Sequence, residues 1–289
     1  MWAIILHGGA KQIEAGMAQA NRSGCLTALE AGKSVLVRGG SAADAVEAAI
    51  RVLEDDATFN CGYGSALNAD GDIEMCAAIM EGGGFEVGAV SAIRGVRHPI
   101  SVAKAMLHAQ PVLVTGEGAR RFAAGAGAEL CDPDALKTPG QRRRSDRGGS
   151  HDTVGCLALD AVGRLAAGTS TGGLDGSPAG RVGDSPQPGC GYYADDAVGA
   201  VAFSGDGEHI ARKILAARVM FALGQTGPDA ALGLALEHVA AIGGEAGGIV
   251  LTPDGRFGWR HNSPHFAVAF QNEAAADARF FICREDEGA

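Results

Sequence analysis

The sequence lacks the features that would place it among nucleic-acid-binding, zinc-binding or membrane proteins. Its 34 aspartates and glutamates outnumber its 24 lysines and arginines, and the net charge of −10 argues against a nucleic-acid surface. None of the seven cysteines belongs to a C-x-x-C pair, which leaves no zinc framework and suits a reducing compartment. No apolar run approaches the roughly 20 residues of a membrane span, and the first residues lack a signal-peptide pattern. We therefore expect a cytoplasmic protein that binds neither nucleic acid nor membrane.

The sequence does contain enough apolar material for a full core. With 46% hydrophobic residues, the 289 positions predict one globular domain, 1–289. Apolar patterns bounded by turn residues predict a buried strand and two hairpins, at 2–6, at 154–159 with 165–169, and at 249–251 with 257–259. Together with the helices described next, these antiparallel elements indicate an α+β layered architecture.

Several helices are also indicated. Ser41, with Asp44 three residues on, is typical of a helix N-cap, and the two glycines at 39 and 40 end the helix before it. Helical composition extends over 208–225 and 229–242. In the first of these segments one apolar stripe predicts a face turned to the core, made of Ile210, Ile214, Leu215 and Val219.

One segment, at about 132–152, has the composition of a flexible linker. It contains Pro133, Pro139, the run Arg142-Arg143-Arg144 and the pair Gly148-Gly149, and it shows no apolar periodicity. Because it ends just before Thr153, it divides the chain into 1–152 and 153–289. Both parts supply strands and helices, so we expect them to form one globule even if the chain is cut between them.

Thr153 stands at the head of a predicted strand, in the tripeptide His151-Asp152-Thr153. An isolated Asp-Thr pair is most often a turn or a cap. If the Asp152–Thr153 bond is cut, however, one residue carries both a hydroxyl and a free α-amine, whose pKa of roughly 7.7–8.0 lets it act as a general base near neutral pH. The tripeptide therefore makes Thr153 a candidate N-terminal nucleophile.

Further clusters follow in an order that makes Thr153 more than an isolated match. They are Thr169-Ser170-Thr171-Gly172-Gly173, Gly180 to Pro186 and Ser204 to Glu208, with His7-Gly8-Gly9-Ala10, the segment 59–65 and Gly243-Gly244-Glu245 elsewhere. With these motifs the chain resembles, nearly end to end, the plant-type L-asparaginase and isoaspartyl peptidase family of N-terminal-nucleophile hydrolases. The resemblance implies a four-layer αββα fold and autocatalytic cleavage between Asp152 and Thr153.

The resemblance also implies catalytic roles for residues that match the family's motifs. Thr153 is then the nucleophile, and the Thr171 hydroxyl hydrogen-bonds and orients it. Ser204 and Gly205 form the oxyanion pair, in which a hydroxyl and a backbone N–H meet the developing negative charge. Asn60 supports the nucleophile from the first fragment. An ordinary threonine at a strand end is the alternative for Thr171.

Substrate binding is assigned to Arg181, Asp184 and Gly205. The planar guanidinium of Arg181 suits an α-carboxylate, and the Asp184 carboxylate suits an α-ammonium, which the Gly205 carbonyl also receives. The alternative is a mutual surface ion pair between Arg181 and Asp184. The segment Gly-Asp-Ser-Pro also occurs around the nucleophile of chymotrypsin-like proteases, but no matching histidine segment precedes it here.

A sodium site is implied by the segment 53–63, which is similar to the family's sodium loop. The expected ligands are the backbone carbonyls of Leu53, Glu54, Asp56, Phe59, Cys61 and Tyr63, since carbonyl oxygens suit a hard cation. The spaced acidic residues and central glycine of a calcium loop are missing. We expect no cofactor for the chemistry and a structural role for sodium.

The resemblance predicts an isoaspartyl (β-aspartyl) dipeptidase with L-asparaginase side activity, assembled as a homodimer of αβ heterodimers. A glycosylasparaginase and a non-catalytic ligand-binding homologue are the alternatives. Four positions depart from the family's pattern: Lys11 replaces a common glycine, Cys76 a usual aspartate, Ser204 a usual threonine, and Asp206 a frequent threonine or histidine. Lys11 is expected to stiffen a loop that moves during self-cleavage in relatives, which leaves the rate of processing open.

Overall fold

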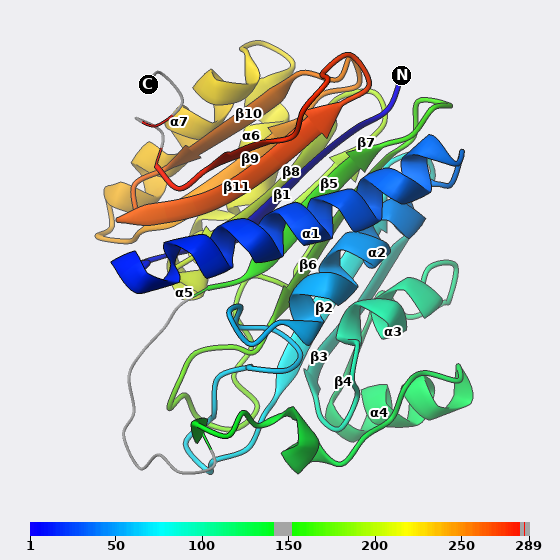
Figure 1. Ribbon diagram of the computed structural model, residues 1–289, viewed down its shortest axis with the longest axis vertical. Coiled ribbons are helices and arrows are strands. Elements are labelled where there is room, and N and C mark those ends of the chain that lie inside the picture. The colour runs from blue at the N-terminus through cyan, green and yellow to red at the C-terminus, as the bar shows by residue number, and fades with distance from the viewer. Residues whose placement is uncertain (142–151, 284–285, 287–289) are drawn as a thin grey trace.

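The chain folds into four layers, two helical and two of β-sheet, in the order αββα (Figure 1). The computed structural model describes residues 1–141, 152–283 and 286. The larger sheet has eight strands in the order β12 (Arg279–Phe281), β11 (His265–Asn272), β1 (Ala3–Lys11), β5 (Val154–Leu159), β6 (Leu165–Thr171), β2 (Met75–Glu81), β3 (Val87–Ile93) and β4 (Leu113–Thr115). The smaller sheet has four, in the order β10 (Phe257–His261), β9 (Ala246–Leu251), β8 (Gly199–Gly205) and β7 (Tyr192–Asp195). Neighbouring strands are antiparallel except β3 and β4, which are parallel.

Helices cover the outer face of each sheet. Figure 1 shows α1 (Ala18–Val37), α2 (Ala42–Asp55) and α3 (Pro99–Ala105) in front of the large sheet. On the far side, α6 (Leu215–Leu223) and α7 (Pro228–Ala240) pack on the small sheet, and the short α5 (Gly207–Lys213) leads into them. The remaining helical segments are α4 (Gly116–Gly125), beside β3 and β4, and the 3₁₀ turns η1 (Ala15–Met17) and η2 (Pro133–Leu136). None of the helices in the described ranges is long and apolar enough to cross a membrane.

The core has three apolar layers, one between each pair of neighbouring structural layers. The layer between the sheets includes Ile5, Leu157, Tyr192, Trp259 and Phe266. Because α2 covers one face of β5 and β6 and the small sheet covers the other, these two strands are buried on both faces. Thr153 and Thr171 are consequently held at the ends of two strands that are buried along their whole length.

The predicted α+β sandwich, both hairpins and the helix cap are confirmed. β5 pairs with β6, and β9 with β10, in antiparallel register. The Asp44 N–H donates to the Ser41 hydroxyl at 3.1 Å, so Ser41 is the N-cap of α2. The N–H groups of Gly39 and Gly40 bond the carbonyls of Leu36 and Val35, which ends α1 as predicted.

The prediction of one continuous helix over 208–225 is wrong, because the helix is interrupted at Ile214. This residue adopts a left-handed conformation, with φ of 46°, and separates α5 from α6. The Ile214 side chain is 48% exposed, whereas Ile210, Leu215 and Val219 are buried as predicted. Periodicity missed the break because an isoleucine rarely adopts positive φ.

The described part of the predicted linker is partly ordered. Residues 133–136 form η2, Leu136 is buried, and the Gln141 side chain donates to the Ser65 carbonyl at 2.7 Å. The arginine run, Gly148-Gly149 and His151 lie outside the described residues. Since β5 and β6 lie between β1 and β2, the segments before and after Thr153 are interleaved in one sheet.

Candidate active site

The predicted catalytic residues meet where strands of the two sheets end. Thr153 directly precedes β5, and Thr171 is the last residue of β6. The pairing of Val154 with Ser170 brings the two threonines to the same end of neighbouring strands. Ser204, near the end of β8, reaches this point from the other sheet, and all three residues are buried.

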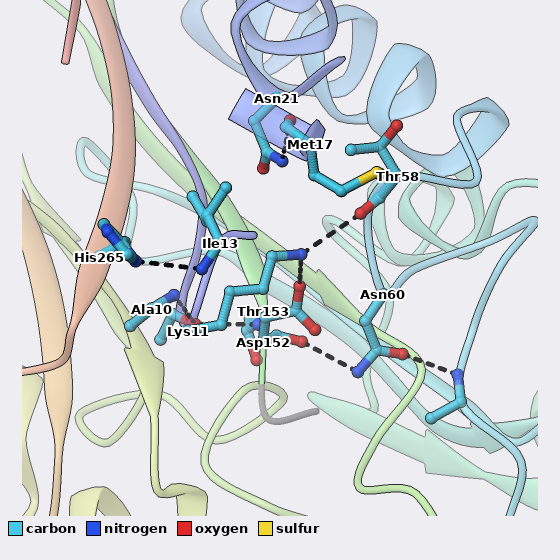
Figure 2. Close-up of polar contacts among 12 residues, drawn as sticks. Ala10, Lys11, Ile13, Met17, Asn21, Thr58, Asn60, Asp152, Thr153 and His265 are labelled. Carbon is cyan, nitrogen blue, oxygen red and sulfur yellow. Dashed lines mark hydrogen bonds and ion pairs between the residues drawn. The ribbon is translucent and has the colours of Figure 1, made fainter. Parts of the chain in front are cut away.

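The carbonyl oxygen of Asp152, in the bond before Thr153, accepts two side-chain hydrogen bonds. Asn60 Nδ2 donates to it at 3.1 Å and Thr171 Oγ1 at 3.2 Å (Figure 2 shows Asn60, Asp152 and Thr153). The Asn60 amide is held in this orientation by the N–H of Ala66, which bonds Oδ1 at 2.8 Å, and by the carbonyl of Gly173, which accepts from Nδ2 at 2.7 Å. Two donors on a carbonyl oxygen are what a tetrahedral oxyanion at this carbon requires.

The Thr153 backbone and hydroxyl are both anchored by serines. Its N–H donates to Ser204 Oγ at 2.9 Å, and the same oxygen accepts the Ala10 N–H at 2.9 Å. The Thr153 hydroxyl lies 2.9 Å from Ser185 Oγ. Sequence reasoning gave no role to Ser185, although it directly follows Asp184 in a segment already singled out.

Thr171 makes a different contact from the one expected of it. In the intact chain its hydroxyl donates to Asp152 O and accepts the Gly173 N–H at 3.1 Å, while the Thr153 hydroxyl is bonded to Ser185. The orientation of the nucleophile by Thr171 stays a prediction for the cleaved chain.

Arg181 and Asp184 lie in the same pocket wall but do not pair as the alternative interpretation supposed. The guanidinium of Arg181 bonds the Glu208 carboxylate through Nε and Nη2, both at 2.8 Å. Burial raises the pKa of Asp184 to about 7, and no partner in the described part of the chain bonds its Oδ2. A ligand ammonium beside this carboxyl would favour its charged form.

In the intact chain the pocket is almost closed. Its wall includes Asp152, Thr153, Arg181, Asp184 and Gly205, and its volume is ≈ 10 Å³, about the space that one water needs. Gly205 has φ of 140°, and a Cβ there would overlap the Glu245 carbonyl, so only glycine fits. As it stands, this pocket has no room for a ligand larger than about one water molecule.

The segment expected to bind sodium is a tight loop at the C-terminal end of α2. The carbonyls of Leu53, Glu54 and Asp56 accept the N–H groups of Asp56, Tyr63 and Phe59 at 3.2, 2.7 and 3.1 Å. Each carbonyl keeps a second lone pair and a helix C-terminus favours a cation, so the chemistry of these oxygens suits a hard ion, and sodium binding here stays a prediction. The described ranges contain no group of three His, Cys, Asp or Glu side chains able to hold a metal.

The side-chain carboxyl of Glu54 lies in the core, apart from the backbone carbonyls that are expected to bind sodium. It is fully buried and accepts hydrogen bonds from the Ser170 hydroxyl at 2.7 Å and the Ile100 N–H at 3.0 Å. Burial raises its pKa to about 8, against the effect of these two bonds. Glu54 therefore ties the end of β6 to the start of α3.

The four-layer arrangement is that of the N-terminal-nucleophile hydrolases. A family model described as asparaginase matches residues 1–148 and 137–280, and the chain belongs to this asparaginase family. It is 41% identical over 264 residues to the isoaspartyl peptidase/L-asparaginase of Rattus norvegicus, covering 86% of this chain and 79% of the rat protein. The human protein of the same name is 38% identical, covering 83% and 84%. A probable isoaspartyl peptidase/L-asparaginase of Drosophila pseudoobscura pseudoobscura is 36% identical, covering 92% of each chain.

Proposed function

We propose that this protein is an isoaspartyl dipeptidase with slower L-asparaginase activity, and that it cuts its own chain to make Thr153 the nucleophile. The observation that carries the proposal is the pair of donors, Asn60 Nδ2 and Thr171 Oγ1, on the carbonyl oxygen of the bond to be cut. The substrate class is supported by the rat and human relatives, whose names give both activities.

Self-cleavage begins when Thr153 Oγ1 attacks the carbonyl carbon of Asp152. Asn60 and Thr171 stabilise the negative charge that develops on the oxygen. The C–N bond then breaks, the hydroxyl proton passes to the Thr153 nitrogen, and an ester joins Asp152 to Oγ1. Water hydrolyses this ester, leaving a carboxylate on Asp152 and both a free amine and a free hydroxyl on Thr153.

The mature enzyme repeats this chemistry on its substrate. The Thr153 amine takes the hydroxyl proton, Oγ1 attacks the side-chain carbonyl of a β-aspartyl group, and the Ser204 hydroxyl with the Gly205 N–H stabilises the oxyanion. The leaving amine takes the proton, and water then releases aspartate from the ester. Because Arg181 binds the α-carboxylate and Asp184 the α-ammonium, only a free aspartyl end is accepted.

Three further features belong to the proposal. A sodium ion held by the carbonyls of 53–63 would stabilise the loop that carries Asn60. We also propose a homodimer of cleaved αβ heterodimers, on the basis of the family resemblance. A cytoplasmic location is supported by the cysteines: all seven lie in described residues, and none is in a disulfide.

Four substrates assayed side by side with fully cleaved protein test the function. We expect cleavage of β-aspartyl-leucine, slower release of ammonia from L-asparagine, and no cleavage of α-aspartyl-leucine. Preference for N-acetylglucosaminyl-asparagine would select a glycosylasparaginase instead. No turnover of any of the four would indicate a non-catalytic homologue.

A further inference from the structure

Lys11, the last residue of β1, lies beside the bond that is proposed to be cut. Its Nζ forms an ion pair with the Asp152 carboxylate and donates to the Thr58 carbonyl at 3.3 Å (Figure 2). The ammonium also lies 5.9 Å from the centre of the Phe59 ring. Lys11 therefore joins Asp152 to the loop that carries Asn60, whose amide bonds the Asp152 carbonyl.

The backbone of β1 is shaped to make this contact. The pairing of β1 with β11 shifts between His7 and Ala10, so Gly8 and Gly9 form a bulge. Gly9 has φ of 110°, and a Cβ there would overlap the Asp152 side chain. After the bulge, the Ala10 N–H is fixed by Ser204 Oγ at 2.9 Å. The Asp152 side chain is thus enclosed between the Gly9 backbone and the Lys11 ammonium.

The charges at this point bear directly on the cleavage step. The Asp152 side chain is 1% exposed and that of Lys11 14%, so water screens neither group strongly. Attack by Thr153 places a second negative charge on the carbonyl oxygen of the same residue. The negative charge of the Asp152 carboxylate repels that charge, and the Lys11 ammonium offsets the repulsion. The ion pair also fixes the side chain of the residue whose carbonyl must stay on Asn60 and Thr171.

We propose that Lys11 is a positioning residue for self-cleavage, an inference that rests on the function proposed above. It acts through the Asp152 carboxylate, and it holds the scissile carbonyl against its two donors. Lys11 does not take part in bond breaking. Its contribution is to place the Asp152 side chain and to offset the negative charge of its carboxylate.

The test follows the appearance of the fragment that starts at Thr153 by denaturing mass spectrometry. We expect Lys11→Met to slow cleavage at least about 10-fold, and Lys11→Arg, which keeps the charge, to recover most of the rate. In the Asp152→Asn protein, the same Lys11→Met change should alter the rate less than about threefold, because its partner charge is already gone. This loss of effect separates action through Asp152 from general destabilisation.

Lys104→Met is the matched control. Lys104 is also partly buried and pairs with Asp44 and Glu47, but it is on α3, away from the site. Cleavage of Lys11→Met at the wild-type rate, equal slowing by Lys104→Met, or an undiminished effect in the Asp152→Asn protein would each overturn the proposal. Thermal unfolding of Lys11→Met in a Thr153→Ala background checks that the fold is intact. If the wild-type chain itself stays whole, the proposed self-cleavage fails, which is a separate result.

Discussion

Arg181 presents the Nε–Nη2 edge of its guanidinium to the Glu208 carboxylate, through two hydrogen bonds of 2.8 Å. The Arg181 side chain is 16% exposed and that of Glu208 45%, so the arginine is held from the solvent side. The guanidinium has further N–H groups, on Nη1 and Nη2, which can donate to a carboxylate in the pocket that Arg181 lines.

Replacing Arg181 should therefore harm substrate binding and spare self-cleavage. Arg181→Ala leaves a substrate carboxylate without its partner, a loss of roughly 2–5 kcal/mol, so kcat/KM for β-aspartyl-leucine should fall at least about 30-fold. The fragments should still appear, because the donors on the Asp152 carbonyl come from Asn60 and Thr171. Glu208→Ala removes an exposed partner worth about 0–1 kcal/mol and should cost less than about fivefold. Equal losses in the two variants would contradict this assignment.

The buried Asp184 should make the folded protein less stable as the pH rises. Its pKa is raised from 3.8 to about 7, so the native state binds the proton more tightly than the unfolded state. Stability is therefore lost as the pH rises from about 4 to about 7. Asp184→Asn, neutral throughout, should raise the Tm at pH 8 by an amount that corresponds to up to about 4 kcal/mol, and change it little at pH 4.

Calorimetry in a Thr153→Ala background, which keeps the chain whole, measures this effect. The same Asp184→Asn change should abolish most activity in the cleavable protein, because the substrate ammonium loses its charged partner. A Tm gain of the same size at both pH values would refute the role of the buried charge.

Ser185 should contribute to self-cleavage through the Thr153 hydroxyl that it contacts at 2.9 Å. Ser185→Ala removes one hydrogen bond, worth about 1 kcal/mol, so cleavage should slow about fivefold. Ser91→Ala is the control, since Ser91 is equally buried and its hydroxyl has no partner among the described residues. Identical cleavage rates in the wild-type and Ser185→Ala proteins would show that the contact does not orient the nucleophile.

The identity of the nucleophile is tested by removing its hydroxyl. Freshly made wild-type protein should convert into two fragments, the second beginning at Thr153, whereas Thr153→Ala should remain one chain without hydrolase activity. Intact mass measured over several days at neutral pH distinguishes the two outcomes. Full activity in wild-type protein that stays uncut would rule out the mechanism, because an internal threonine has no α-amine to act as base.

Local sequence patterns predicted the hairpin turns and helix ends well, because these features depend on residues that are close together in the sequence. The turn between β5 and β6, the Ser41 cap and the glycines after α1 depend on residues close together in sequence. The position of Thr153 before β5 followed from the same kind of pattern. The four-layer order, in contrast, came from the family resemblance, since periodicity does not say which sheet packs on which.

The parts of the site that the sequence did not predict are contacts between segments far apart along the chain. Lys11 and Asp152 are 141 positions apart, and Thr153 and Ser185 are 32 apart. Glu208 was given no contact with Arg181, although its carboxylate bonds that residue from 27 positions away. Such pairs depend on where strand ends meet in three dimensions, and one sequence carries no local signal for them.

The interleaving of strands from the two parts of the chain determines how refolding depends on protein concentration. β5 and β6, from the part that starts at Thr153, lie between β1 and β2, from the part that ends at Asp152. The uncut chain folds in a first-order reaction, at a rate independent of protein concentration. After the proposed cleavage, two polypeptides must associate to rebuild the centre of one sheet, so recovery from denaturant becomes second order. In a dilute solution the cleaved enzyme would therefore recover only slowly after unfolding, whereas the uncut chain would refold at the same rate at any concentration.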